Sequence, residues 1–329
     1  MNQFLLKLSA TQQIGAMFVL VFGALLLASI AALLLSLRDR GDDAAADAWR
    51  RELSRIDGVL RTSWVMVFVF WVGWLSGDAV TLVLFALVSF FALREFMTLS
   101  PTRRGDHRSL VLAFFVVLPI QYTLVGTRHF DLFTVFIPVY VFLAIPVVSA
   151  LANDPARFLE RNAKLQWGIM VCIYGMSHVP ALLLLNFRGF QNRSAFLVFF
   201  LVLVVQTCMV VQYLASRRFK SAPAAPAISD SFAWRSWWTG VLAGSVLGGL
   251  LAGLTPFAPG QALALAFVAC VAGSLGHLVM KALKRDRGIP NWGRDGVSVT
   301  GAGGLLDRVD ALCFAAPIFF HSSRWYFGI

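Results

Sequence analysis

The sequence predicts an all-α fold, a polytopic integral membrane helical bundle of about ten transmembrane helices. Of its 329 residues, 58% are hydrophobic and only 14% are charged, and the mean hydropathy is +0.74. A soluble domain is about half apolar and about a quarter charged. The apolar residues also form runs of the ~20 residues that a membrane-crossing helix needs. Runs such as VLVFGALLLASIAALLLSL do not alternate with polar residues, as the strands of a membrane β-barrel would.

The hydropathy pattern places ten spans along the chain. They lie at about 13–37, 63–77, 79–94, 109–125, 130–149, 167–186, 195–214, 237–254, 260–281 and 311–326. The first run continues into Arg38 and Arg40, which favours a stable span, although its GALLLASIAA segment also suits a signal peptide. The pair within 63–94 leaves little room for two helices, so we expect a tight reversal there.

The positive charges predict how the spans are oriented. If the spans alternate, one side of the membrane receives the loops 38–62, 94–108, 148–166, 215–236 and 282–310. These loops carry 22 of the 28 Lys and Arg residues. The positive-inside rule therefore predicts that these loops, including the last polar one, lie in the cytoplasm and that the N-terminus lies outside. The expected location is the inner (cytoplasmic) membrane. The net charge of +11 then reflects topology and anionic headgroups, and no nucleic-acid partner is expected.

The chain divides at about residue 62. Residues 1–62 are expected to form the first span and a charged, partly helical linker, and residues 63–329 to form the main membrane domain. Small residues at helical spacing predict close helix packing at Gly240, Gly244, Gly248 and Gly249. The cysteines lack metal-ligand spacing and are interpreted as small buried hydrophobes at Cys172, Cys208, Cys270 and Cys313.

The most chemically suggestive segment is the loop at 281–310, KALKRDRGIPNWGRDGVSVTGAGGLLDRVD. Asp307 and Asp310 lie three residues apart, so both carboxylates share one face of a starting helix and could hold a divalent cation. Lys284 and Arg285 could neutralise phosphates. The turn TGAGG at 300–304 lets backbone N–H groups approach a ligand closely. Helix capping by the acids and a topological role for the bases are the alternative interpretation.

This stretch resembles the signature of the phosphatidate cytidylyltransferases, or CDP-diacylglycerol synthases. That signature has a Ser, a Lys-Arg pair, an acid and a Gly, followed by H-G-G, two apolar residues and D-R-x-D. Here it appears as KRDRG at 284–288, WG at 292–293 and GGLLDRVD at 303–310. Apolar segments such as FALVSFFALREF and LCFAAPIFFH extend the resemblance from about residue 60 to the end.

The resemblance implies a reaction of CTP with phosphatidate, with Mg²⁺ as cofactor, that gives CDP-diacylglycerol and pyrophosphate at the cytoplasmic face. The implied catalytic set is Lys284, Arg285, Asp307 and Asp310, and its two acids are the implied metal ligands. The implied substrate-phosphate set is Asp286, Gly303, Gly304 and Arg308. The implied partners are phosphatidate or another anionic phospholipid, CTP, the membrane and a second copy of the chain in a homodimer.

The chain departs from the family pattern at several polar positions. The residues found there instead are Met209, Phe232, Ala233, Arg235, His277, Met280, Lys281 and Ala302. No acidic residue lies between Glu160 and Asp230, so a metal would depend mainly on Asp307, Asp310 and Asp286. His277 is either a replacement ligand, which suits zinc-type metals better than magnesium, or a polar residue of its helix.

Three functions follow from these observations. The first is a phosphatidate cytidylyltransferase-type enzyme of phospholipid biosynthesis, with full or weakened activity. The second is a catalytically degenerate member of the same family that binds an anionic lipid or a membrane partner. The third, an unrelated transporter, is disfavoured because the spans contain almost no charged residue for an ion path.

Overall fold

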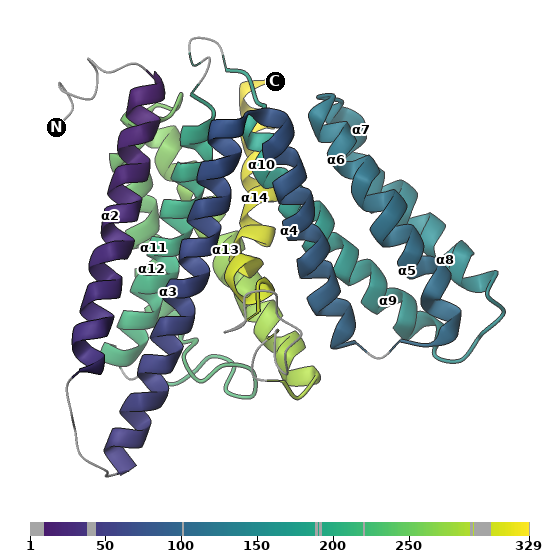
Figure 1. Cartoon of the computed structure of the whole chain (residues 1–329), viewed down its shortest axis with the longest axis horizontal. Helices are drawn as coiled ribbons and strands as arrows, with labels where there is room; N and C mark the ends of the chain where they lie inside the picture. The colour runs from purple at the N-terminus through teal and green to yellow at the C-terminus, as the bar shows by residue number, and fades with distance from the viewer. Residues whose placement is uncertain are drawn as a thin grey trace.

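The computed structural model describes residues 10–37, 44–100, 102–187, 190, 193–219, 221–289, 292 and 304–328, and these form a bundle of helices (Figure 1). Ten long helical segments follow one another in this part of the chain, and each overlaps one predicted span. Seven are single helices: α2 (Ala10–Ser36), α3 (Ala44–Ser76), α4 (Asp78–Thr98), α11 (Ala195–Phe219), α12 (Trp234–Leu250), α13 (Pro259–Asp286) and α14 (Leu306–Phe327).

The other three segments are composite, because a π-helical turn joins two α-helices in each. They are α5 (His107–Leu112), η2 (Ala113–Val117) and α6 (Leu118–Gly126); α7 (Phe130–Val135), η3 (Phe136–Val141) and α8 (Phe142–Ala150); and α9 (Phe158–Gly168), η4 (Ile169–Gly175) and α10 (Met176–Leu183). Pro119, Pro138 and Pro180 lie in or shortly after these turns. Proline lacks the N–H that the regular ladder requires, so the helix accommodates it by a wider turn.

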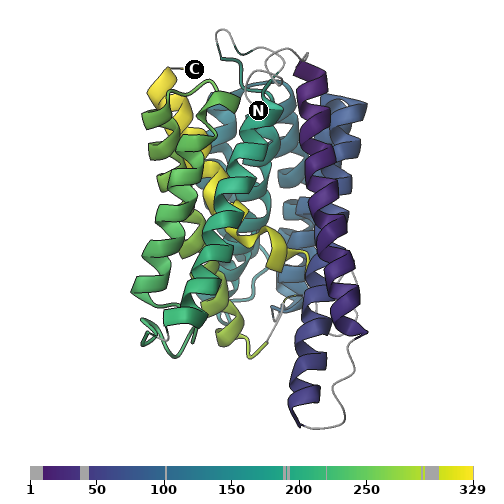
Figure 2. The same ribbon diagram turned by 90° about the vertical axis from the view of Figure 1, so that its left-hand side faces the viewer.

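Length and composition support membrane crossing. Within the described residues, five helical segments are long and apolar enough to cross a membrane: Asp78–Thr98, Arg104–Gly126, Phe130–Ala150, Ala195–Phe219 and Pro259–Asp286. Shorter apolar stretches lie at Val21–Ser36 and Ser63–Gly73. The second of these is the apolar half of α3, whose other half is the charged linker and projects beyond the bundle (Figure 2). The prediction of a polytopic helical membrane protein is confirmed.

The segments run alternately up and down the bundle (Figures 1 and 2). The C-terminal ends of α2, α4, α8, α11 and α13, from which the five basic loops begin, therefore lie at one end, as the charge pattern requires. The tight reversal expected within 63–94 is made by one residue, Gly77, between α3 and α4. Gly77 has φ +88°, a backbone conformation that is accessible to glycine at little cost.

Helices α11, α12, α13 and α14 pack closely together. A Cβ atom on Gly240 would lie 2.6 Å from the Cys208 carbonyl oxygen, and one on Gly244 would lie 2.5 Å from Cys270 Sγ. The close packing predicted from these glycines is confirmed, and Gly248 is equally confined by Ala266. Gly249 has more room, since a Cβ there would meet nothing closer than 3.6 Å. All four cysteines are buried and unbridged, as expected.

We expect Gly244→Ala to destabilise the protein by about 1–3 kcal/mol, because the added methyl group overlaps both a side chain and a backbone carbonyl. The matched control is Gly249→Ala on the same helix, which we expect to leave stability unchanged or to raise it by up to about 1 kcal/mol through helix propensity. Unfolding of the two variants in detergent micelles measures the difference. Equal stabilities would show that α12 can move away from α11 and α13 at no cost.

Candidate functional site

The site is built around the first turn of α14, which begins partway along the height of the bundle and crosses it obliquely (Figure 2). No side chain of α14 caps its own N-terminus. Instead the Glu95 carboxylate, at the end of α4, accepts hydrogen bonds from the N–H groups of Leu305 and Leu306, both at 3.0 Å. Glu95 is only 1% exposed. A carboxylate at a helix N-terminus satisfies N–H groups that have no partner within the helix and is favoured by the helix dipole.

Asp307 is held by two donors. Lys284 Nζ, near the end of α13, lies 2.6 Å from Asp307 Oδ1, and each of these side chains is 12% exposed. The backbone N–H of Trp292 donates to Asp307 Oδ2 at 2.8 Å. The Trp292 ring is buried and stacks on Phe96, the neighbour of Glu95, with ring centroids 5.3 Å apart. The signature segment is thereby fixed to α4, α13 and α14 together.

Asp310 is also held by two donors. His277 Nδ1, on α13, lies 2.7 Å from Asp310 Oδ2, and the N–H of Ala311 donates to Oδ1 at 2.6 Å. The Asp310 side chain is 4% exposed and that of His277 is 23% exposed. The structure supports neither interpretation of His277 as it stands. The imidazole is hydrogen-bonded to Asp310, one of the two acids predicted to bind a metal.

Asp307, Asp310 and His277 line one end of a cavity of about 390 Å³. The polar end is formed by His277, Asp307, Arg308 and Asp310. The remaining wall comes from α2, α3, α4, α10, α11 and α14 and is almost entirely apolar. Met209, at a position where the family pattern has an aspartate, belongs to this wall. The volume falls in the range of small-molecule sites, and the arrangement suits a ligand with one charged end and a hydrocarbon body.

The other predicted site residues are less close to the cavity. Arg285 is exposed on α13, and Asp286 is paired with Arg287 at 3.4 Å. Gly304 is buried just before α14, whereas Gly303 lies outside the described residues. The structure therefore brings together Lys284, Asp307, Arg308 and Asp310 from the predicted sets and does not bring Arg285 or Asp286 to the cavity wall.

The replaced positions form their own contacts nearby. Lys281 Nζ donates to Ser229 Oγ at 3.2 Å and to Ser231 Oγ at 3.4 Å. Phe232 and Met280 are buried. Serine hydroxyls and apolar side chains therefore lie around α13 where the family pattern has charged groups.

The residues of this site do not fit a magnesium ion held by the protein. The two carboxylates already accept four hydrogen bonds or ion pairs, from Lys284, Trp292, His277 and Ala311. Across the described ranges, no three His, Cys, Asp or Glu residues lie close enough together to hold a metal ion. Mg²⁺ prefers carboxylate oxygens with several waters, whereas here each acid faces a cationic or imidazole partner.

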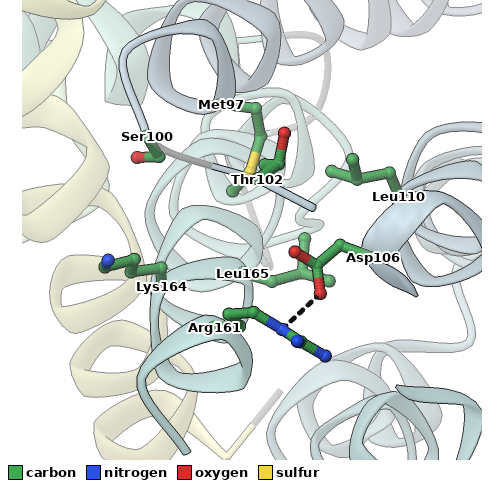
Figure 3. A pocket seen from close by; sticks show the side chains of 8 residues that line it. All are labelled: Met97, Ser100, Thr102, Asp106, Leu110, Arg161, Lys164 and Leu165. Atoms are coloured by element: carbon green, nitrogen blue, oxygen red, sulfur yellow. Dashed lines mark ion pairs between the residues drawn. The ribbon is translucent and has the colours of Figure 1, made fainter. Parts of the chain in front are cut away.

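A second charged cluster lies at the end of the bundle near α5 and α9 (Figure 3). Arg161 Nε lies 2.8 Å from Asp106 Oδ1, and Arg161 Nη1 lies 2.6 Å from Asp154 Oδ2. The Arg161 side chain is 4% exposed. The adjoining cavity measures about 10 Å³, which is room for a single water at most. This cluster therefore stabilises the fold rather than binding a substrate.

Close to Arg161, on the outside of α9, Glu160 pairs with Lys164. The hydrogen bond from Lys164 lowers the pKa of Glu160 below its ordinary value, and the charges of Arg157 and Arg287 act in the same direction. Arg287 follows α13 directly, so its charge reaches from the signature segment to α9. The exposed pair contributes little to stability.

Sequence reasoning missed three buried charged residues, Glu95, Asp106 and Arg161. Glu95 lies in FALREF, one residue beyond the predicted span, and was counted with the apolar resemblance. The available signal was an acid at the end of an apolar span, followed directly by Phe96, since such an acid is rarely buried without a partner. Arg161 was counted only as a topological charge.

The chain is similar in sequence to several known proteins. The sequence model of the Cytidylyltransferase family matches residues 59–326. The protein YnbB of Escherichia coli strain K12, described as uncharacterised, is 33% identical over 270 residues, which cover 81% of this chain and 86% of that protein. The phosphatidate cytidylyltransferase of Mycobacterium leprae is 29% identical over 174 residues, 52% of each chain. That of Rickettsia felis is 26% identical over 152 residues, 43% of this chain and 64% of its own. The chain thus spans less than two thirds of the length of these two cytidylyltransferases.

Proposed function

Because this chain belongs to the cytidylyltransferase family, we propose that it binds phosphatidate in the cavity lined by the first turns of α14. Its role in phospholipid metabolism would then be a CDP-diacylglycerol synthase-like function. The observation that carries the proposal is the shape of the cavity, which has one charged end and an apolar body. A phosphatidate has the matching form, with a phosphate monoester at one end of two hydrocarbon chains.

The charged end supplies both attraction and orientation. Arg308 lines the cavity beside Asp307 and Asp310, and Lys284 lies behind Asp307. A guanidinium binds phosphate oxygens through two parallel hydrogen bonds, which fixes the direction of the phosphate as well as its position. Asp307 forms an ion pair with Lys284, and Asp310 is hydrogen-bonded to His277. The ion pair and the hydrogen bond make the two acids repel a phosphate less than two bare carboxylates would.

In the proposed transfer, a phosphate oxygen of phosphatidate attacks the α-phosphorus of CTP. The bond from that phosphorus to the bridging oxygen of the β-phosphate breaks, and pyrophosphate leaves with the electron pair. Such a displacement depends on positioning and on stabilisation of negative charge more than on covalent help. In this chain the residues placed to do so are Arg308 and Lys284. Magnesium enters the proposal as a reagent to be tested, not as a bound group.

Lipid binding without transfer is the second candidate function. It is favoured by the pairing of Asp307 with Lys284 and of Asp310 with His277, and by Met209 in the cavity wall. Each of these features leaves fewer unpaired carboxylates at the position where the family pattern implies a metal ion. Both candidates share the bound lipid and differ only in turnover.

We expect Arg308→Gln to weaken retention of phosphatidate by about tenfold or more, since a charge-assisted hydrogen bond contributes about 1.5–3 kcal/mol. The measurement is lipid retained by the full chain in nanodiscs that contain phosphatidate and phosphatidylcholine. The matched control is Arg218→Gln, an exposed arginine in the last turn of α11, which should retain lipid as the wild type does.

Turnover is measured on the same samples with CTP, in the presence and absence of Mg²⁺. Formation of CDP-diacylglycerol that is lost in Asp310→Asn supports the transfer reaction. Retention of phosphatidate without turnover supports the second candidate. Equal retention of phosphatidate and phosphatidylcholine by the wild type would contradict both.

A further inference from the structure

The first helix within the described residues, α2, lies outside the region that the family model matches, which begins at residue 59. It nevertheless forms part of the cavity wall. Phe18, Val21 and Leu25 of α2 line the same cavity as His277 and Asp310. These three residues are spaced by three and four positions, so they lie along one face of the helix. An element added to the family domain therefore faces the proposed lipid directly.

The two faces of α2 are in different surroundings. On the face turned away from the bundle, Val19 is 73% exposed and Leu27 is 69% exposed. On the inner face, Phe18 is only 2% exposed. Its ring lies 5.1 Å from that of Phe199 on α11 and 5.7 Å from that of Phe70 on α3. The rings of Phe70 and Phe199 are also in contact, with centroids 5.2 Å apart. Phe18 therefore packs against the place where α3 and α11 meet in the cavity wall.

Helix α2 is held mainly by α3, along which it packs. Across this contact Trp64 Nε1 donates to Ser29 Oγ at 3.1 Å. Figure 1 shows α2 at the edge of the bundle, beside α3, with α11 and α12 behind it. A helix on the outside of the bundle can change its inner side chains without disturbing α13 and α14, which hold the charged end of the site.

We propose that α2 determines which acyl chains the protein accepts, with Phe18 and Leu25 setting the length available beyond the charged end. The occupant is an acyl chain of the anionic glycerophospholipid whose phosphate lies near Arg308. The inference rests on the proposed lipid binding and adds its selectivity. Charge at one end fixes the depth of the phosphate, so the distance to the α2 wall decides how many methylene groups are buried in protein.

The size of the effect follows from the transfer of methylene groups. Each additional buried CH₂ changes the affinity by about fourfold. Removing the Phe18 ring extends the apolar space at the α2 wall, and a longer chain can then fill it. We therefore expect Phe18→Ala to raise the ratio of long-chain to short-chain phosphatidate retained by about fourfold or more.

The experiment uses the full chain, purified from vesicles that contain an equimolar mixture of phosphatidates with short, medium and long saturated chains. Bound lipid is extracted and quantified by mass spectrometry. Val19→Ala is the matched control, since Val19 neighbours Phe18 but faces away from the bundle. Leu25→Ala is a second test variant at another turn of the same face, for use should Phe18→Ala fail to fold.

A shift toward long chains in Phe18→Ala or Leu25→Ala, with Val19→Ala unchanged, supports the proposal. The same chain distribution in all folded variants, with phosphatidate still retained, overturns the role of α2 and leaves the proposed function intact. Equal retention of phosphatidate and phosphatidylcholine by the wild type, measured in nanodiscs as above, overturns the proposed function itself. A shift of equal size in Val19→Ala also overturns the proposal, because it would mean that selection occurs outside the cavity.

Discussion

Replacing Glu95 with alanine is expected to lower the free energy of unfolding by about 3–5 kcal/mol and to abolish preferential retention of phosphatidate. The substitution removes the acceptor of two buried N–H groups, those of Leu305 and Leu306, and each unsatisfied group costs about 1–3 kcal/mol. The start of α14 then loses these two hydrogen bonds to α4. Since Asp307 and Arg308 lie in that turn, the charged end of the cavity changes with it.

Two further variants distinguish the loss of the Glu95 hydrogen bonds from a general destabilisation of α4. Glu95→Gln keeps one carbonyl oxygen, so we expect it to lose about half as much stability as Glu95→Ala. Arg94→Ala alters the exposed neighbour and should change stability by no more than about 0.5 kcal/mol. Unfolding in mixed micelles and phosphatidate retention are measured together. A stable Glu95→Ala variant that still selects phosphatidate would show that α14 is positioned by its apolar packing alone.

Replacing Arg161 with alanine is expected to cost about 3–5 kcal/mol, because it leaves carboxylates behind in a buried ion-pair cluster. Arg161 contacts Asp106 and Asp154 through different nitrogen atoms and also donates to the carbonyl of Ala156 at 2.8 Å. A lysine has a single charged nitrogen and cannot reproduce this fork. Arg161→Lys should therefore be almost as unstable as Arg161→Ala, as measured by the same unfolding experiment.

The control for Arg161 is an exposed ion pair elsewhere. Arg61 lies 3.4 Å from Asp57 on α3, and both side chains are more than half exposed. Arg61→Ala should change stability by less than about 1 kcal/mol. Because the cavity beside Arg161 is too small for a lipid, the unfolding loss in Arg161→Ala should come without a change in acyl-chain preference in the protein that remains folded. A change in that preference would show that the two charged clusters are coupled.

Hydropathy predicted the fold because each membrane helix is a continuous run of apolar residues, which can be recognised from the local sequence alone. The runs of apolar residues are sufficient to place each helix, and the Lys and Arg residues are sufficient to predict which connections share an end. Even the reversal at Gly77 could be anticipated from the shortage of residues between two spans. The charged half of α3 was less predictable, because nothing in its composition distinguishes a projecting helix from a linker with partial structure.

The site was predicted only in part, because its contacts join residues far apart in the sequence. The pairing of Lys284 with Asp307 lies within one signature, and both residues were predicted members of the site. The pairing of Asp310 with His277 depends on the alignment of α13 with α14, which hydropathy does not define. The cap from Glu95 depends on α4, and the cavity wall depends on α2. None of these distances follows from spacing along the chain.

The cap on α14 also has a consequence for how the protein is made. Glu95 and its two partners are separated by 210 and 211 positions. A ribosome that adds about 5–20 residues per second needs about 10–40 seconds to cross that interval. Throughout this time Glu95 has been synthesised while its final partners have not. The charged end of the cavity therefore cannot form until nearly the whole chain has been synthesised, and a shorter chain presents its earlier membrane helices without the cap on α14.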